Sequence, residues 1–194
     1  MEAKAYQLKV TLLGAKPPIW RRLEVKGDTK LSTLHQILQD VMGWSDSHMH
    51  QFIVKGKIYG AHHPDFFMDR ENERKVRLDQ VLQKPKDRMV YEYDFGDSWQ
   101  HEVLVEKVVA AEKGRGRYPL VTAGKRACPP EDCGGIPGYY HFLEVLGNPR
   151  HPEHEELLEW CDEEYDPEGF DLQEVNRTFH GGRAPAKPHP PSST

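Results

Sequence analysis

The chain has 194 residues, of which 37% are hydrophobic and 29% are charged, a composition that suits a globular core and argues against a disordered chain. Its formal net charge is −5, and its three cysteines are too few for a disulfide framework. It has no run of about 18 apolar residues and no apolar signal segment at the N-terminus, so we expect a soluble, cytoplasmic protein without a membrane partner.

The negative charge is concentrated near the C-terminus. Residues 151–174 hold eleven Asp or Glu and no Lys or Arg, whereas residues 1–150 hold twenty acids and twenty-three Lys or Arg. Such an acidic block can form a solvated helix face, bind a basic partner, or pair with basic residues in the rest of the same chain. Neither part has the concentrated positive charge of a dedicated nucleic-acid binder, so we expect a protein partner.

The first sixty residues predict an α+β fold. The apolar spacing from Leu31 to Val41 indicates a helix, with Ser32 or Thr29 as its cap and Gly43 at its end. Alternating apolar residues predict strands on both sides of this helix, over 6–13, 19–25, 50–54 and 58–59. Two strands, a helix and two strands are the order of a β-grasp-like mixed sheet with one crossing helix.

A central aromatic hairpin is the most distinctive feature of the sequence. Two alternating runs flank the turn Gly96-Asp97-Ser98, namely Tyr91, Tyr93, Phe95 and Trp99, His101, Val103, Val105. A three-residue loop, which we favour, pairs Phe95 with Trp99 and Tyr93 with His101, so that rings share one face. A two-residue loop pairs Asp94 with Trp99 instead. In the favoured register Asp94 and His101 project to opposite faces, and a site that uses both needs the other register or a bulge.

The C-terminal part predicts loops and helices. A loop over 108–117 and a short strand over 118–122 precede the tight turn-rich segment Cys128–Gly138. Helices are expected over 139–146, from 151 onward, and over 172–179, the last of them capped by Asp171. The Pro-rich tail 184–194 is predicted to be disordered, which leaves residues 1–183 as a single domain.

Four motifs, in order, resemble the plasmid pRiA4b ORF-3-like family over residues 6–183. They are Pro17-Pro-Ile-Trp-Arg-Arg22, His48-Met-His-Gln-Phe52, Tyr93-Asp-Phe-Gly-Asp-Ser-Trp-Gln-His101 and Cys128-Pro-Pro-Glu-Asp-Cys-Gly-Gly135. The resemblance implies a single α+β domain without an assigned activity and a link to plasmids or mobile elements. Some relatives carry a resolvase-like label, but this sequence has no Ser or Tyr nucleophile among arginines and no strongly basic helix.

Carboxylates and one imidazole near the hairpin form a candidate metal site. Asp97 and His101 lie near the hairpin tip, and Glu131 and Asp132 lie in a loop that can fold over it. These ligand types suit Mg²⁺, Mn²⁺ or Zn²⁺, and a bound ion with open positions activates water for hydrolysis. The alternative, which we favour, is structural: Asp97 makes an Asx-type turn, the two loop acids bond to backbone, and His101 is a cross-strand neighbour of Tyr93.

Cysteines and histidines elsewhere give weaker candidates. Cys128 and Cys133 are separated by four residues, at the limit of zinc-site spacing, and no second pair follows. We therefore favour two packed cysteines in a glycine-rich turn. His48 and His50 share a face if they lie on a strand, which permits metal binding, although a structural role at a sheet edge or helix cap is the simpler interpretation.

Two functions follow from these features. The first is a non-enzymatic binding or adaptor domain that uses sheet edges or the acidic helix to bind a protein. The second is a metal-dependent hydrolase with Asp97, His101, Glu131 and Asp132 as its site, for which nucleic acid is one candidate substrate. No cofactor is expected other than the divalent ion of the second hypothesis.

Overall fold

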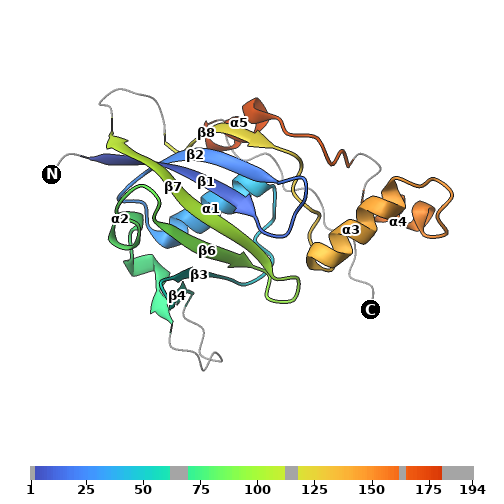
Figure 1. Cartoon of the computed structure of the whole chain (residues 1–194), viewed down its shortest axis with the longest axis horizontal. Coiled ribbons are helices and arrows are strands. Elements are labelled where there is room, and N and C mark those ends of the chain that lie inside the picture. Colours follow the sequence, from blue (N-terminus) through green and yellow to red (C-terminus); the bar gives the residue numbers. More distant parts are fainter. Residues whose placement is uncertain (1–2, 62–69, 112–117, 162–164, 181–194) are drawn as a thin grey trace.

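The structure is a computed structural model that describes residues 3–61, 70–111, 118–161 and 165–180. Within these ranges eight strands form one mixed sheet in the order β5-β4-β3-β6-β7-β1-β2-β8, in which β4 and β5 are the parallel pair (Figure 1). The α+β prediction is thereby confirmed. The strands are β1 Lys4–Leu12, β2 Trp20–Lys26, β3 His50–Val54, β4 Lys57–Gly60, β5 Glu71–Asn72, β6 Arg88–Tyr93, β7 Trp99–Ala110 and β8 Leu120–Lys125. The helices are α1 Leu31–Met42, η1 Glu73–Lys75, α2 Leu78–Val81, α3 Gly135–Leu146, α4 His154–Trp160 and α5 Leu172–His180.

Helix α1 covers one face of the sheet and builds the core with it (Figure 1). Its apolar stripe is buried as predicted, from Leu31 to Val41. Gly43 ends it with a φ of 84°, a left-handed conformation that glycine adopts without strain. The predicted side-chain cap is wrong, because Lys30 holds the N-cap position without a side-chain bond. The carbonyl of Val76 accepts the N–H of Leu31 instead, at 2.9 Å.

The central hairpin β6–β7 lies between β3 and β1, but its predicted register is wrong. Tyr93 lies opposite Trp99 and Tyr91 opposite His101, so the loop has five residues and not three. Asp94 adopts a left-handed φ of 56°, and its carbonyl accepts the N–H of Ser98, which ends β6 before Phe95. The shift is two residues, an even number, so the rings of Tyr91, Tyr93, Trp99 and His101 remain on their predicted face, whereas Phe95 lies in the loop and is only partly buried.

The C-terminal segments attach to one end and one edge of the sheet. Asn176 of α5 donates to the carbonyl of Val121 and accepts its N–H, at 2.8 and 2.9 Å. These two bonds occupy part of the outer edge of β8, which is otherwise open to strand addition. Glu168 of the acidic block forms an ion pair with Arg126 at 2.8 Å, so this block does pair with the body of its own chain.

Other boundaries differ modestly from the predictions. β7 runs to Ala110, so the expected loop over 108–117 starts later, and residues 112–117 lie outside the described part. α3 begins at Gly135 instead of residue 139, and Asp171 caps α5 as predicted, accepting from Gln173 and Glu174. The tail 184–194 also lies outside the described residues, and the single domain over 1–183 remains a prediction.

Tight packing around α3 predicts that Gly138→Ala destabilises the fold. A Cβ at this position would lie 1.8 Å from the carbonyl oxygen of Cys133, a backbone atom that cannot rotate away. We expect the free energy of unfolding in urea to fall by about 2–3 kcal/mol. Gly60→Ala is the control, because its nearest neighbour lies at 3.4 Å, and equal losses in the two variants would contradict the packing shown here.

Candidate functional site

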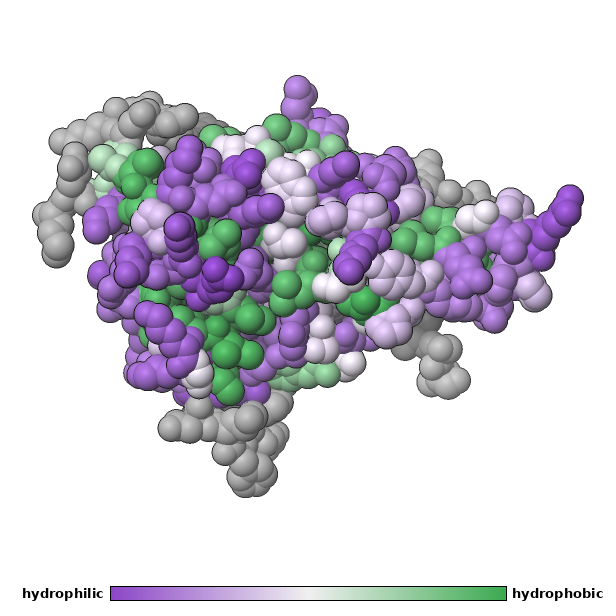
Figure 2. Space-filling model, in the orientation of Figure 1, coloured by the Kyte–Doolittle hydropathy of each residue, from purple (hydrophilic) through white to green (hydrophobic). Residues whose placement is uncertain are grey.

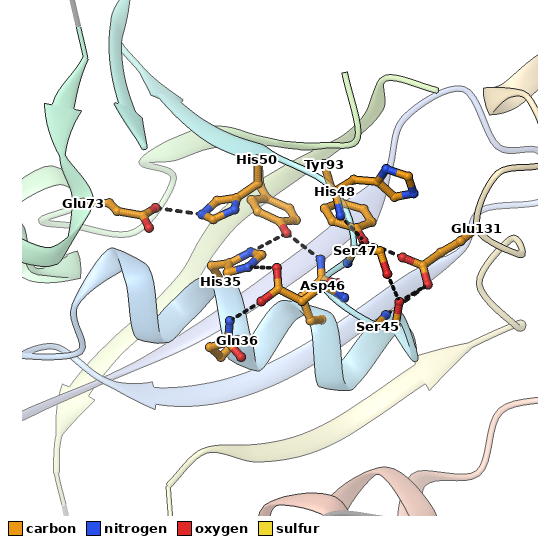
Figure 3. Close-up of polar contacts among 12 residues, drawn as sticks. His35, Gln36, Ser45, Asp46, Ser47, His48, His50, Glu73, Tyr93 and Glu131 are labelled. Atoms are coloured by element: carbon orange, nitrogen blue, oxygen red, sulfur yellow. Dashed lines mark hydrogen bonds and ion pairs between the residues drawn. The ribbon is translucent and has the colours of Figure 1, made fainter. Parts of the chain in front are cut away.

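Three of the sequence motifs meet around the hydroxyl of Tyr93, at the end of β6 (Figure 3). This oxygen accepts the backbone N–H of Ser47 at 3.0 Å and donates a short hydrogen bond to Glu131. The second carboxylate oxygen of Glu131 accepts the N–H and the hydroxyl of Ser45, at 3.1 and 2.6 Å. The segment after α1, the hairpin and the Cys128 loop are therefore joined through one phenol and one carboxylate. We call this set of hydrogen-bonded residues, Ser45, Ser47, Tyr93 and Glu131, the Tyr93 junction.

The electrostatics of this junction favour a neutral phenol and a bonded carboxylate. Burial, and then the hydrogen bond to Glu131, raise the pKa of Tyr93 far above its usual range, so the hydroxyl keeps its proton and donates it. Trp44 stacks on the Tyr93 ring at 5.0 Å and donates its indole N–H to the carbonyl of Pro129 at 3.0 Å. The Glu131 carboxylate, for its part, uses one oxygen to accept from Tyr93 and the other to accept from Ser45.

A group of three side chains whose types can ligate a metal, His48, Asp94 and Asp132, lies beside this junction. The Nε2 atom of His48 is 2.9 Å from Oδ1 of Asp132 and 3.8 Å from Oδ2 of Asp94. Oδ1 of Asp94 accepts the N–H of Gly96 at 2.9 Å, as in an Asx turn. Asp94 is nearly buried, whereas the Asp132 side chain is 59% exposed. The group therefore opens to solvent on the Asp132 side.

A second group lies deeper, between α1, β3 and η1 (Figure 3). The rings of His35 and His50 stack in parallel, 3.4 Å apart. Nε2 of His35 is 2.7 Å from Asp46, and Nε2 of His50 is 2.8 Å from the buried carboxylate of Glu73. Nδ1 of His35 is 2.8 Å from the hydroxyl of Tyr91.

The hydrogen bonds around His35 favour one tautomer of a neutral imidazole. Gln39 donates to the hydroxyl oxygen of Tyr91, whose own proton then goes to Nδ1 of His35. In this arrangement Nε2 of His35 carries the proton and donates to Asp46, which suits a neutral imidazole. Burial, and secondarily the neighbouring His50, lower the pKa of His35, in agreement with this assignment. The group joins a helix to the sheet as a satisfied buried network.

Among the described residues, the four that were predicted as a hydrolase site do not form one group of close ligand atoms. His101 is completely buried, packs against Trp44 at 5.3 Å, and bonds through Nδ1 to the carbonyl of Trp99. Asp97 accepts the N–H of Gly134 at 3.1 Å, and Glu131 belongs to the Tyr93 junction. Within the described ranges, Asp97, His101 and Glu131 belong to no group of three close ligand atoms. Asp132 does, together with His48 and Asp94.

Cys128 and Cys133 are free thiols in the loop before α3. Burial raises the pKa of each to about 12, so both hold their protons at neutral pH, in which form thiols ligate metals poorly. In the part of the chain that the structure describes, neither belongs to a group of three potential metal ligands. Both instead pack against the core, as the simpler sequence interpretation has it.

Sequence reasoning identified only some of the residues in these groups. His48 and His50 attract attention as a pair, but they enter different groups, because His48 precedes β3 and turns to Tyr93. Sequence reasoning missed His35, because a histidine on an apolar helix face gives no signal of its own. It also missed the role of the Tyr93 hydroxyl, since the ring alone accounts for the hydrophobic pattern.

A model of the family described as plasmid pRiA4b ORF-3-like protein matches residues 4–174. The chain belongs to this family. A relative, the uncharacterized protein y4hQ of Sinorhizobium fredii (strain NBRC 101917 / NGR234), is 35% identical over 179 residues, 91% of each chain. The crystal structure of a protein of unknown function, MM3350 from Methanosarcina mazei Go1, is similar with a TM-score of 0.81 and 37% identity. That match covers 90% of this chain and 99% of that one.

The Tyr93 junction predicts a large stability loss for Tyr93→Phe. The change leaves the Glu131 carboxylate without its phenolic donor and two backbone N–H groups, those of Ser47 and His48, without an acceptor. We expect the free energy of unfolding in urea to fall by about 2–3 kcal/mol. Tyr140→Phe removes a more exposed hydroxyl that bonds only to backbone, and its loss should be about 1 kcal/mol. If Tyr140→Phe lost more stability than Tyr93→Phe, the Tyr93 hydroxyl would not be the more important of the two.

Burial of His101 predicts a dependence of stability on pH. Burial lowers its pKa from the ordinary 6.5 to about 4, so the folded chain holds the ring neutral while the unfolded chain protonates it. Stability from this residue is complete above pH 6.5 and falls as the pH drops toward 4, by up to about 3 kcal/mol. His101→Leu should flatten the curve of unfolding free energy against pH in this window. Replacement of the exposed His141 by Gln should not, and an unchanged slope in His101→Leu would contradict the assignment.

Proposed function

We propose that this pRiA4b ORF-3-like protein is a non-enzymatic binding domain and that the uncovered face of its sheet meets a protein partner. Helix α1 covers only the opposite face (Figure 1). On the uncovered face hydrophobic patches lie among hydrophilic side chains, a mixture typical of interfaces between proteins that also exist apart (Figure 2). The observation that carries the proposal is a hollow on this face next to an aromatic-basic cluster.

The aromatic-basic cluster consists of Trp20, Lys9 and Arg22. The ammonium of Lys9 and the guanidinium of Arg22 lie 5.3 and 5.2 Å from the Trp20 ring. Arg22 also forms a two-pronged ion pair with Glu106, at 2.6 and 2.9 Å, which fixes its position. Tryptophan and arginine held in place in this way are the residue types that carry most binding energy in protein interfaces.

The adjoining hollow has a volume of about 490 Å³ and basic walls. Arg22, Lys86 and Lys107 line it, with Glu106 as its acid and Leu104 as an apolar contact. Three cations against one carboxylate favour a partner segment that presents acidic side chains beside an apolar one. Strand addition is less suited to this chain, because Asn176 already occupies part of the β8 edge.

The placement of the predicted catalytic residues supports a binding role. His101 is sealed in the core and Glu131 is saturated with structural hydrogen bonds. Within the described residues no helix is both long and apolar enough to cross a membrane. The link to plasmids or mobile elements, which the family description suggests, remains a prediction.

A metal-dependent hydrolase is the second candidate. The group of His48, Asp94 and Asp132 favours it, because these side chains approach one another at a solvent-accessible position. A hydrolase predicts turnover of a generic phosphodiester or ester in the presence of Mn²⁺, and loss of that turnover in Asp132→Asn. A binding domain predicts no difference between the wild type and this variant.

The binding surface is tested with Trp20→Ala and Arg22→Glu. Proteins captured by the full-length wild-type chain are identified by mass spectrometry, and each candidate is then purified and titrated calorimetrically. We expect Trp20→Ala to weaken binding of the true partner by about 2 kcal/mol, roughly thirtyfold, and Arg22→Glu to abolish it. Lys57→Glu, at an exposed position on β4 and far from Trp20 in the strand order, is the control and should bind as the wild type does. A partner that binds all four proteins equally would place the interface elsewhere.

A further inference from the structure

The imidazole of His48 has a ring nitrogen without a hydrogen bond. Its Nε2 atom is shielded from solvent, and no aligned hydrogen bond reaches it from the described residues. The oxygen of Asp132 lies 2.9 Å away without forming a hydrogen bond to this nitrogen, and the oxygen of Asp94 lies at 3.8 Å. A shielded nitrogen of this kind costs free energy unless a further group binds to it.

The spacing of the three side chains suits a single small cation. One ligand atom from each residue lies within 4.8 Å of the other two. Two ligands about 2.1 Å from one ion lie about 3.0 Å apart at a right angle, about 3.4 Å apart in a tetrahedron and about 4.2 Å apart when opposite. The distance of 3.8 Å from His48 to Asp94 falls inside this range, and the distance of 2.9 Å from His48 to Asp132 lies at its lower edge.

The charges around this point also favour a cation. Two carboxylates converge on one imidazole, so negative charge predominates even when the ring is protonated. One oxygen of Asp94 is occupied by Gly96, and the other is turned toward His48. Because Asp94 is nearly buried, water compensates its charge poorly, and a divalent ion compensates it better.

Each of the three residues directly follows a member of the Tyr93 junction. Ser47 precedes His48, Tyr93 precedes Asp94, and Glu131 precedes Asp132. The hydrogen bonds among Ser47, Tyr93 and Glu131 therefore hold the three backbones in place before any ion arrives. A support of this kind is what metal sites require around their ligands.

We propose that His48, Asp94 and Asp132 form a surface site for one divalent transition-metal ion, Mn²⁺ or Zn²⁺. One imidazole and two carboxylates suit these ions better than Mg²⁺, which prefers an all-oxygen shell. Three protein ligands leave coordination positions free, and the exposure of Asp132 turns them toward solvent. The bound ion links the segment before β3, the hairpin turn and the Cys128 loop.

The test is calorimetric titration of the full-length protein with MnCl₂ and ZnCl₂ after treatment with a chelator. We expect one site per chain for each ion and a higher melting temperature when it is filled, with weaker binding of MgCl₂. Asp132→Asn and His48→Gln should each lower the affinity for Mn²⁺ at least about tenfold. Asn tolerates the left-handed φ of 60° at position 132, so this variant should fold normally, which circular dichroism checks.

A matched control separates this site from scattered surface histidines. His141 pairs with Glu153 at 2.9 Å on the exposed surface of α3 and belongs to no three-residue group among the described side chains. His141→Gln should therefore bind Mn²⁺ as the wild type does. Failure of the wild type to bind either ion at millimolar concentration would overturn the proposal. So would an affinity for Mn²⁺ that Asp132→Asn and His48→Gln leave unchanged.

Discussion

The hydrogen bond from the Tyr93 hydroxyl to the Glu131 carboxylate is the contact on which the surrounding structure depends. It joins segments 38 residues apart, and the N–H of Ser47, 46 residues from Tyr93, completes the junction. A buried phenol that keeps its proton is a strong donor to a carboxylate, and a bond to a charged group contributes more than a neutral one. Without it the Cys128 loop loses its principal polar tie to the hairpin.

This contact explains why some polar residues near the hairpin are structural and others remain available. Glu131 uses both oxygens to hold loops, and His101 lies in the core against Trp44. Asp94 and Asp132 stand next in the chain to anchored residues, so their side chains converge without serving the anchor themselves. Side chains that retain bonding capacity and stand on a backbone held by hydrogen bonds suit the binding of an ion or a partner.

Hydrophobic periodicity predicted the strands and helices that bury one regular face. The alternation in β1 and the helical spacing in α1 each describe one buried face, and both elements were found where expected. The hairpin register failed at Asp94, because its left-handed backbone and Asx bond to Gly96 end β6 earlier than the aromatic alternation suggests. The alternation of apolar residues does not reveal such a five-residue turn.

The candidate site was less predictable than the fold, because it depends on contacts between distant segments. His48 and Asp132 each stand out in the sequence, but nothing in their spacing joins them across 84 residues. Proximity in sequence favoured Asp97 with His101 instead, and the pleat of the strand then carried His101 into the core. Grouping residues by their nearness to the hairpin tip therefore could not find the group of His48, Asp94 and Asp132.

The most direct test of this account is a double-mutant cycle between Tyr93→Phe and Glu131→Gln, measured by urea unfolding. If the bond between the two side chains joins the three segments, the double variant loses less stability than the sum of the single losses, by about 1–3 kcal/mol. Losses that add to within about 0.5 kcal/mol would show that the residues act independently, and the account would be contradicted.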